Sequence, residues 1–290
     1  MFVFKAAVVG AGVMGGEIAQ VIAAADIPVL LKDVDQKFVD AGLQKAREVT
    51  ESQVGKLVKR EKISAQAGRA QIEHTLGLIT GTTAYDGFGD VDFVIEAVPE
   101  RMEIKHAVFS ELDAVTPGHA VLASNTSGLS VTEIGDATNR PDKVVGFHFF
   151  WPASFMRLIE VVEGDETSPE TMQAAANFAQ AIKKMPVRCA ECPGFVVNRI
   201  LTSTAAEIWR YQDETGIDPE QLDEHIKQAA GMPMGPFRVA DMSGLDTVVK
   251  VARDMRDAYG DRFYVHKGME ELVERGDLGA KTGKGFYEHA

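Results

Sequence analysis

The sequence predicts an α/β protein with a doubly wound parallel sheet, followed by an all-helical C-terminal domain. Two observations support this prediction. From the start of the chain to about position 190, apolar runs of strand length alternate with stretches of helical periodicity. After Pro193-Gly194, only helical periodicity continues. The change of pattern predicts a first domain over residues 1–187 and a second over residues 188–290.

The individual elements follow from apolar runs and helix-start signals. Expected strands are residues 6–9, 29–32, 78–80, 92–97, 120–124, 144–149, 158–163 and 186–189. Expected helices are residues 14–25, 38–60, 102–115, 195–211, 219–230 and 247–259. Two further helices are expected to begin at Ser130, which forms a capping box with Glu133, and at Ser168-Pro169.

Composition and charge exclude several classes of function. The 290 residues are 45% hydrophobic and 25% charged, which is normal for a globular protein with a sizeable core. The net charge of −13 argues against nucleic acids and anionic membranes as partners. No apolar run reaches the roughly 18–20 residues of a membrane helix. The N-terminus lacks a basic leader, so we expect no targeting segment and a cytoplasmic location.

Cys189 and Cys192 have the spacing of a redox pair or of half a zinc site. The chain has no further cysteine to complete a zinc site, and no metal is expected. Pro193-Gly194 follows at once, which does not fit a redox pair at a helix N-terminus. We expect two reduced, partly buried residues at the end of a strand.

The segment from Gly10 to Gly15 fits the pattern G-x-G-x-x-G between the first strand and the first helix. The first glycine allows a tight turn, Gly12 lets a pyrophosphate approach the backbone, and the third permits close packing of helix on strand. The pattern predicts a Rossmann-type domain that binds a dinucleotide. The alternative is a glycine-rich turn in another kind of α/β protein.

Asp33 ends the second strand, roughly 20 positions after the first glycine. A carboxylate there accepts the ribose hydroxyls of NAD and repels the 2′-phosphate of NADP, so NAD is the expected coenzyme. The neighbouring Lys32 weakens this discrimination somewhat. If the glycine pattern is only a turn, Asp33 is a surface charge.

His148 lies near the end of an apolar strand, where a histidine is more often part of the core than a catalyst. Glu160 lies inside the next apolar strand, where an unpaired charge is costly. If residues 150–156 fold back, the two side chains can pair across the strands. Such a pair fixes the imidazole tautomer and raises its basicity, as a general base requires.

Ser124-Asn-Thr-Ser127 follows another strand, where α/β sheets bind ligands. The sequence leaves open whether this segment binds a ligand or only forms a capped turn.

Together these residues resemble the 3-hydroxyacyl-CoA dehydrogenase family over essentially the whole chain. The resemblance also includes motifs elsewhere in the sequence: Ile95-Glu-Ala-Val-Pro-Glu100 with Lys105, His148-Phe-Phe-x-Pro152, Pro193-Gly-Phe-Val-Val-Asn198-Arg199, Pro233-Met-Gly-Pro236, Gly244-Leu-Asp246 and Lys281-Thr-Gly-Lys-Gly-Phe-Tyr287. It implies a homodimer formed through the C-terminal domain, which also binds substrate. The match extends to residue 290, so we expect a complete dehydrogenase.

The resemblance implies that His148 is the general base in oxidation of a 3-hydroxyacyl-CoA, and the acid in reduction. Glu160 would orient it and stabilise the imidazolium, while Ser127 and Asn198 would bind the reacting oxygen or thioester. Asn198 has an alternative role as a residue that starts a helix. Lys56, with Lys59 nearby, would meet the CoA phosphates, unless these lysines only form a solvated helix face. The implied cofactor-binding residues are Gly10, Gly12, Met14, Gly15, Asp33, Val98, Glu100, Lys105 and Lys281, with Glu100 and Lys105 at the nicotinamide ribose.

One position departs from the family pattern. Trp151 stands where the family usually has Asn in His-Phe-Phe-Asn-Pro, and an indole cannot replace a short amide without changing the pocket. This change keeps open a dehydrogenase of non-CoA substrates such as sugar acids or carnitine. A more distant alternative is a non-catalytic NAD-binding structural protein, as in the lens crystallins of this family.

Overall fold

The computed structural model describes residues 2–289 and divides into two compact units, Met1–Cys192 and Pro193–Ala290. The division lies a few residues beyond the boundary expected from the sequence, because β8 (Met185–Ala190) is the last strand of the first unit. Within residues 2–289, no helix has both the length and the apolar character needed to cross a membrane.

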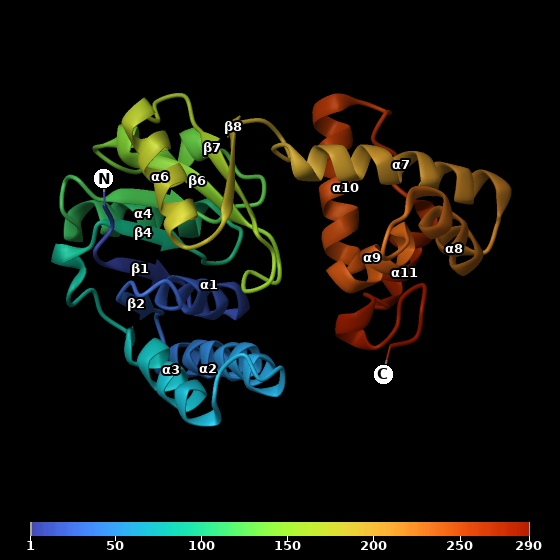
Figure 1. Cartoon of the computed structure of the whole chain (residues 1–290). Helices are drawn as coiled ribbons and strands as arrows, with labels where there is room; N and C mark the ends of the chain where they lie inside the picture. Colours follow the sequence, from blue (N-terminus) through green and yellow to red (C-terminus); the bar gives the residue numbers. More distant parts are fainter. Residues whose placement is uncertain (1, 290) are drawn as a thin grey trace. The chain divides into compact units, whose positions relative to one another are not determined.

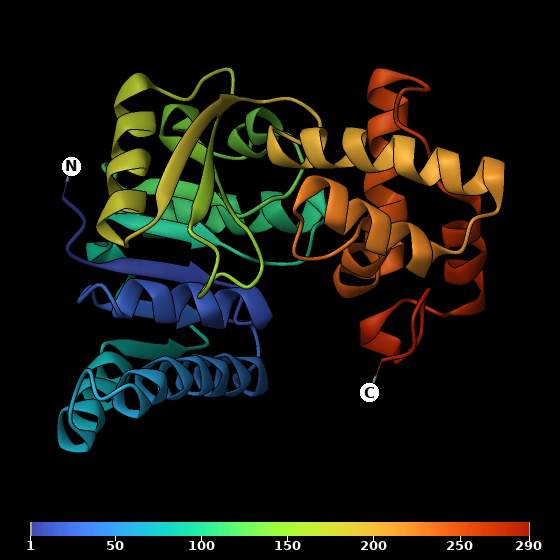
Figure 2. The same ribbon diagram turned by 45° about the vertical axis from the view of Figure 1, so that its right-hand side comes forward.

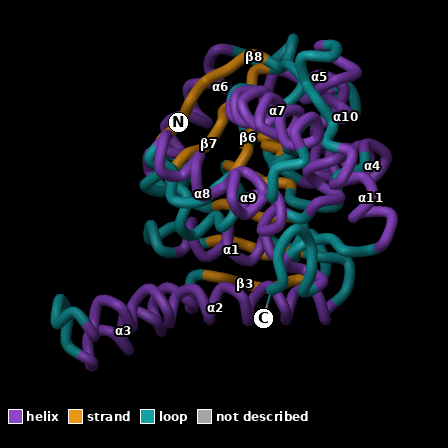
Figure 3. Tube along the Cα trace, turned by 90° about the vertical axis from the view of Figure 1, so that its right-hand side faces the viewer, coloured by secondary structure: helices purple, strands orange, loops and turns teal. Residues whose placement is uncertain are grey.

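The first unit is built on one eight-stranded sheet with the order β3-β2-β1-β4-β5-β6-β7-β8 (Figure 1). The strands appear as one stack of orange segments in Figure 3. Their bounds are β1 Ala6–Val9, β2 Val29–Lys32, β3 Ile79–Thr82, β4 Phe93–Glu96, β5 Val121–Ser124, β6 Val144–Phe149, β7 Leu158–Glu163 and β8 Met185–Ala190. The strand order reverses between β1 and β4, the point where doubly wound sheets bind ligands. The fold class expected from the sequence is therefore confirmed.

All neighbouring strands are parallel except β6 and β7, which are antiparallel. This reversal follows from the short connection between them, since a parallel crossover needs a dozen or more residues. The loop of residues 150–157 makes the connection and brings the start of β7 beside the end of β6.

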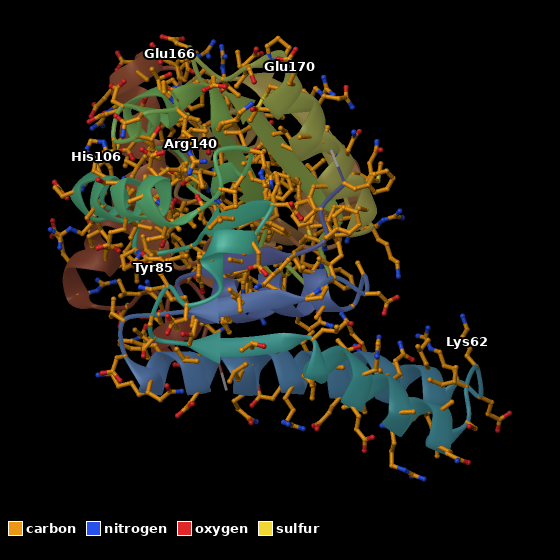
Figure 4. All side chains as sticks on the ribbon, turned by 90° about the vertical axis from the view of Figure 1, so that its left-hand side faces the viewer. Lys62, Tyr85, His106, Arg140, Glu166 and Glu170 are labelled. Carbon is orange, nitrogen blue, oxygen red and sulfur yellow. The ribbon has the colours of Figure 1, made fainter. Side chains whose placement is uncertain are left out.

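Helices cover both faces of the sheet. Alternate strand residues, among them Val8, Ile95 and Phe147, form one core with α1 (Val13–Ala23) and α6 (Pro169–Ala181). Right-handed crossovers on the other side of the reversal point place α4 (Met102–Val115) on the opposite face. Figure 4 shows α4, marked by His106, and α6, marked by Glu170, on opposite sides of the strands.

Two helices form a hairpin beyond the β3 edge of the sheet. They are α2 (Gln36–Lys59) and α3 (Ala65–Gly77), with Lys62 in the turn between them (Figure 4). The sequence analysis missed α3, because only Gly68 and Thr75 of this polar helix are buried. The remaining short helix, α5 (Val131–Gly135), begins as expected at Ser130, whose hydroxyl accepts a hydrogen bond from the Glu133 amide.

Figure 2 shows the second unit as helices joined by turns. The core of its described residues includes Trp209, Phe237 and Leu245. The helices are α7 Val197–Thr215, α8 Pro219–Ala230, α9 Pro236–Ser243, α10 Leu245–Tyr259 and α11 Lys267–Arg275. The sequence analysis missed α9 and α11, which are short. The C-terminal segment is fixed by Asp241, which is buried in α9 and accepts hydrogen bonds from the Phe286 and Tyr287 amides.

Candidate active site

The turn after β1 has the geometry of a dinucleotide site. Gly10 has φ +102°, and a Cβ atom there would lie 2.4 Å from the Ala97 carbonyl oxygen. A Cβ atom on Gly15 would lie 1.7 Å from the Gly10 carbonyl oxygen, so both positions require glycine. A Cβ atom on Gly12 would meet nothing within 4 Å. This open space lies at the N-terminus of α1, where a helix favours an anion such as pyrophosphate.

Asp33 lies beside this turn at the end of β2. Its Oδ2 accepts a hydrogen bond from the Ala11 amide at 2.7 Å, and its Oδ1 accepts one from the Val34 amide at 2.7 Å. The ammonium of Lys32 lies over the ring of Tyr85, 4.2 Å from its centre. The positive charge next to Asp33 in the sequence is therefore engaged by an aromatic face, which supports the preference for NAD.

The expected pairing of His148 and Glu160 is confirmed as geometry. The two residues are directly opposite in the β6–β7 register, and His148 Nδ1 lies 2.8 Å from Glu160 Oε2. Both side chains are buried. Because Nδ1 faces a carboxylate it carries the ring proton, so the neutral imidazole has its basic lone pair on Nε2. The pair can therefore accept a proton at Nε2 and stabilise the resulting charge.

The residues after β5 and β6 are tied together near this pair. Asn125 Oδ1 accepts a hydrogen bond from the Phe149 amide at 2.8 Å, and the Phe150 ring centre lies 4.6 Å from that of the His148 imidazole. Thr126 Oγ1 accepts hydrogen bonds from the amides of Gly128 and Leu129. The segment after β5 is thus a capped turn that also presents Ser127, whose side chain is exposed.

A second buried ionic group lies under the same turn. Lys105 is only 1% exposed, and its ammonium contacts Glu96 Oε1 at 2.8 Å, Glu96 Oε2 at 2.9 Å and Glu100 Oε2 at 3.1 Å. Ser124 donates a hydrogen bond to Glu96 Oε2 at 2.6 Å. Thr126 Oγ1 and the Ser127 amide donate to Glu100 Oε1 at 2.6 and 2.8 Å.

Lys105 and Glu100, the two residues that the resemblance assigns to the nicotinamide ribose, have different environments in this group. The three N–H donors of Lys105 are matched by its three carboxylate contacts, whereas Glu100 is 38% exposed. Burial alone would raise the pKa of Glu100, but the charge of Lys105 and the hydrogen bonds from Thr126 and Ser127 lower it overall. Glu100 therefore presents a carboxylate to solvent, and Lys105 fixes its position.

The sequence analysis gave no role to Glu96. It ends strand β4 and is fully buried, so it is a second charge inside an apolar strand. The argument that singled out Glu160 applies equally to this residue.

The remaining candidate residues lie at helix ends and in loops. Met14 and Val98 are partly buried beside the glycine turn, and Lys56 is exposed in the last turn of α2. In the second unit, Asn198 lies in the first turn of α7. Lys281 forms an ion pair with Asp246, and both side chains are partly exposed.

Cys189 and Cys192 are both partly buried, as expected. Burial and the neighbouring charge of Glu160 raise the pKa of Cys189 to about 12. Its thiol is therefore a poor nucleophile at neutral pH. Among residues 2–289, no group of three or more histidine, cysteine, aspartate or glutamate side chains could hold a metal ion.

The sheet topology, glycine turn and buried histidine–carboxylate pair define a dinucleotide-binding α/β protein with a site suited to proton transfer. Comparison with known proteins identifies the family. Residues 5–192 match the NAD-binding domain of 3-hydroxyacyl-CoA dehydrogenase, and residues 194–289 match its C-terminal domain. The chain belongs to the 3-hydroxyacyl-CoA dehydrogenase family, and its first unit is an NAD-binding domain.

Several relatives show how far the similarity extends. The chain is 38% identical over 286 residues to the 3-hydroxybutyryl-CoA dehydrogenase of Clostridioides difficile, covering 98% of this chain and 99% of that one. It is 39% identical to the fatty acid oxidation complex subunit alpha of a Psychrobacter species, where 98% of this chain matches only 38% of the longer protein. A crystal structure of (S)-3-hydroxybutyryl-CoA dehydrogenase from Ralstonia eutropha has a TM-score of 0.91 at 34% identity, with both chains fully covered.

Proposed function

We propose that the chain catalyses the reversible, NAD-dependent oxidation of (S)-3-hydroxyacyl-CoA to 3-oxoacyl-CoA. The observation that carries the proposal is the His148–Glu160 pair in an NAD-binding unit of this family. In oxidation, His148 Nε2 takes the proton of the substrate's C3 hydroxyl, and Glu160 stabilises the imidazolium that forms. NAD, when bound, supplies the acceptor for the hydride that leaves C3. In reduction, the imidazolium returns its proton to the oxygen.

The other residues bind and orient. Ser127 and Asn198 hydrogen-bond the reacting oxygen or the thioester. Glu100 binds the nicotinamide ribose, with Lys105 acting through it, and Lys281 approaches the coenzyme from the second unit. Lys56 meets the CoA phosphates. The glycine turn, with Met14, Asp33 and Val98, holds the rest of the dinucleotide.

We further propose a homodimer formed through the second unit. Ile200 and Leu201 of α7 are more than half exposed, and Val239 and Met242 of α9 are also exposed. Several exposed large apolar side chains on the helices of one small unit are typical of a protein interface. Sedimentation of the wild type and of Leu201→Glu tests this, since a dimer that uses α7 dissociates in the variant. The cytoplasmic location stays a prediction.

The reaction is tested by the decrease of NADH absorbance with acetoacetyl-CoA and with free acetoacetate, for the wild type and His148→Ala. Oxidation of NADH with the thioester alone, abolished in the variant, is the expected result. Turnover of free acetoacetate in preference would favour a dehydrogenase of non-CoA hydroxy acids. Unchanged activity in His148→Ala would remove the catalytic assignment. The exposed Trp151 is the feature that favours testing this alternative.

A further inference from the structure

The loop of residues 150–157 carries an unusual set of exposed apolar side chains. It runs directly from the strand of His148 to the strand of Glu160. Trp151 is 55% exposed, Phe155 80% and Met156 37%. Large aromatic side chains on a surface lose the free energy of burial unless they contact another molecule.

The loop has a well-defined backbone structure. The amides of Phe155 and Met156 both donate hydrogen bonds to the Pro152 carbonyl oxygen, at 3.0 and 2.9 Å. The Arg157 carbonyl accepts a hydrogen bond from the Met185 amide at 2.7 Å, where β8 begins. Both ends of the loop are therefore fixed to the sheet.

A buried carboxylate forms hydrogen bonds with the middle of the loop. Glu17 of α1 is 2% exposed, and its Oε2 accepts hydrogen bonds from both the amide and the hydroxyl of Ser154, each at 3.0 Å. Its Oε1 lies 3.4 Å from the ammonium of Lys45 in α2. The helix that opens on the coenzyme glycines is thus bonded to the loop that follows His148.

A buried ammonium also forms hydrogen bonds with the same loop. Lys184 donates hydrogen bonds to the carbonyl oxygens of Ala153 at 2.5 Å and Met156 at 2.7 Å. Burial lowers the pKa of Lys184, and the charge of Glu17 opposes this effect. Burying a charge costs free energy. Here two buried groups of opposite charge, Glu17 and Lys184, both form hydrogen bonds with one short loop. Their common effect is to keep the loop in a single shape.

We propose that the loop of residues 150–157 is a preformed binding surface for the acyl chain of the substrate. Trp151 and Phe155 are its specificity-determining residues, and Glu17 and Lys184 are the positioning residues that hold it. The ligand's identity rests on the proposed function. An apolar chain is the part of an acyl-CoA that suits aromatic side chains, and a surface that is already ordered binds it without a further loss of entropy.

The chain's two tryptophans allow a direct test. Trp209 is buried in the second unit and Trp151 is exposed, so Trp209→Phe leaves Trp151 as the single indole fluorophore. This variant is titrated with octanoyl-CoA, butyryl-CoA and free CoA. We expect a blue shift of Trp151 emission with octanoyl-CoA, and binding roughly tenfold tighter than for butyryl-CoA. No change in emission, or the same change with free CoA, would overturn the inference.

Substitutions in the same background test the individual residues. Phe155→Ala is expected to remove most of the preference for the longer chain, while Phe4→Ala, an equally exposed phenylalanine far from the loop in sequence, leaves it unchanged. Glu17→Gln is expected to reduce the preference for the longer chain, because the charge that faces Lys184 is lost. The amide oxygen of Gln can still accept the hydrogen bonds from Ser154, so we expect little change in KM for NADH. A full chain-length preference in Phe155→Ala would refute the assignment.

Hydride transfer to acetoacetyl-CoA, measured in the same preparation, keeps the two proposals apart. Hydride transfer without a change in Trp151 emission would refute the acyl-binding role of the loop and support the proposed reaction. A Trp151 response to octanoyl-CoA without hydride transfer supports the loop and removes the proposed reaction.

Discussion

The first unit buries two groups that pair a carboxylate with a nitrogen base, near the carboxyl ends of its central strands. They differ in what the nitrogen base can do. The His148–Glu160 pair uses an imidazole, whose second ring nitrogen can accept a proton and return it. The Glu96–Lys105–Glu100 group surrounds an ammonium with three carboxylate contacts. The comparison teaches that a buried charge alone does not mark a catalyst. The first group is suited to proton transfer, and the second to holding the turn that carries Ser127.

The largest expected effect breaks the first group. His148→Gln should lower kcat by roughly 10²–10⁴, because the substrate hydroxyl loses its general base. Affinity for NADH should stay nearly constant, as measured by fluorescence titration. His74→Gln is the matched control, since His74 pairs with Asp26 at 2.9 Å on the surface. A comparable loss of activity in the control would mean that the assay reports folding and not proton transfer.

Breaking the second group should mainly cost stability. Lys105→Met leaves the fully buried carboxylate of Glu96 without its cation, a change that costs about 3–5 kcal/mol. We expect a lower free energy of unfolding by urea and weaker coenzyme binding through displacement of Glu100. Lys5→Met removes a partly exposed ion pair with Asp90 and should cost about 1 kcal/mol or less. Equal losses of unfolding free energy in the two variants would contradict the conclusion that the three carboxylate contacts of Lys105 stabilise the fold.

A milder change sharpens the role of Glu160. Glu160→Gln keeps an oxygen that can accept the Nδ1–H bond but removes the charge that stabilises the imidazolium. We expect kcat to fall by roughly 10–100-fold, less than in His148→Gln, with a smaller effect on NADH affinity. Steady-state kinetics measure the first quantity and equilibrium titration the second. Equal loss of turnover and of NADH binding would count against an orienting role.

The smallest expected effect is the pH dependence of the stability that Glu100 contributes. The pKa of Glu100 is lowered in the folded protein, so its contribution to stability is present above the ordinary carboxyl value of 4.5 and is lost as pH falls through the lower folded value. The wild type should therefore lose more stability between about pH 5 and pH 3 than Glu100→Gln does. Thermal unfolding over this range measures the difference, and parallel curves would show that Glu100 contributes nothing.

Part of the site could be predicted because the relevant residues violate the local pattern of their strands. Glu160 is a charged residue in an apolar run, and its separation from His148 along the chain fits a short fold-back. The pair could therefore be predicted from the sequence. Glu96 violates the pattern in the same way, but its partner Lys105 is on a helix, and no local spacing relates the two. Helix α3 was missed because a polar helix with only Gly68 and Thr75 buried shows little apolar periodicity.

The sequence by itself determined the α/β class, the glycine turn with Asp33 and the helical second unit, and it allowed a fold-back that pairs His148 with Glu160. These features depend on local conformational preference and on patterns of burial, which the chain encodes over short distances. Only the tertiary structure decided that Lys105 is saturated by two carboxylates, that Lys32 faces Tyr85, and that Glu17 and Lys184 hold the loop after His148. Each of these contacts joins side chains that are brought together by packing between separate elements, and no periodicity within one element specifies them.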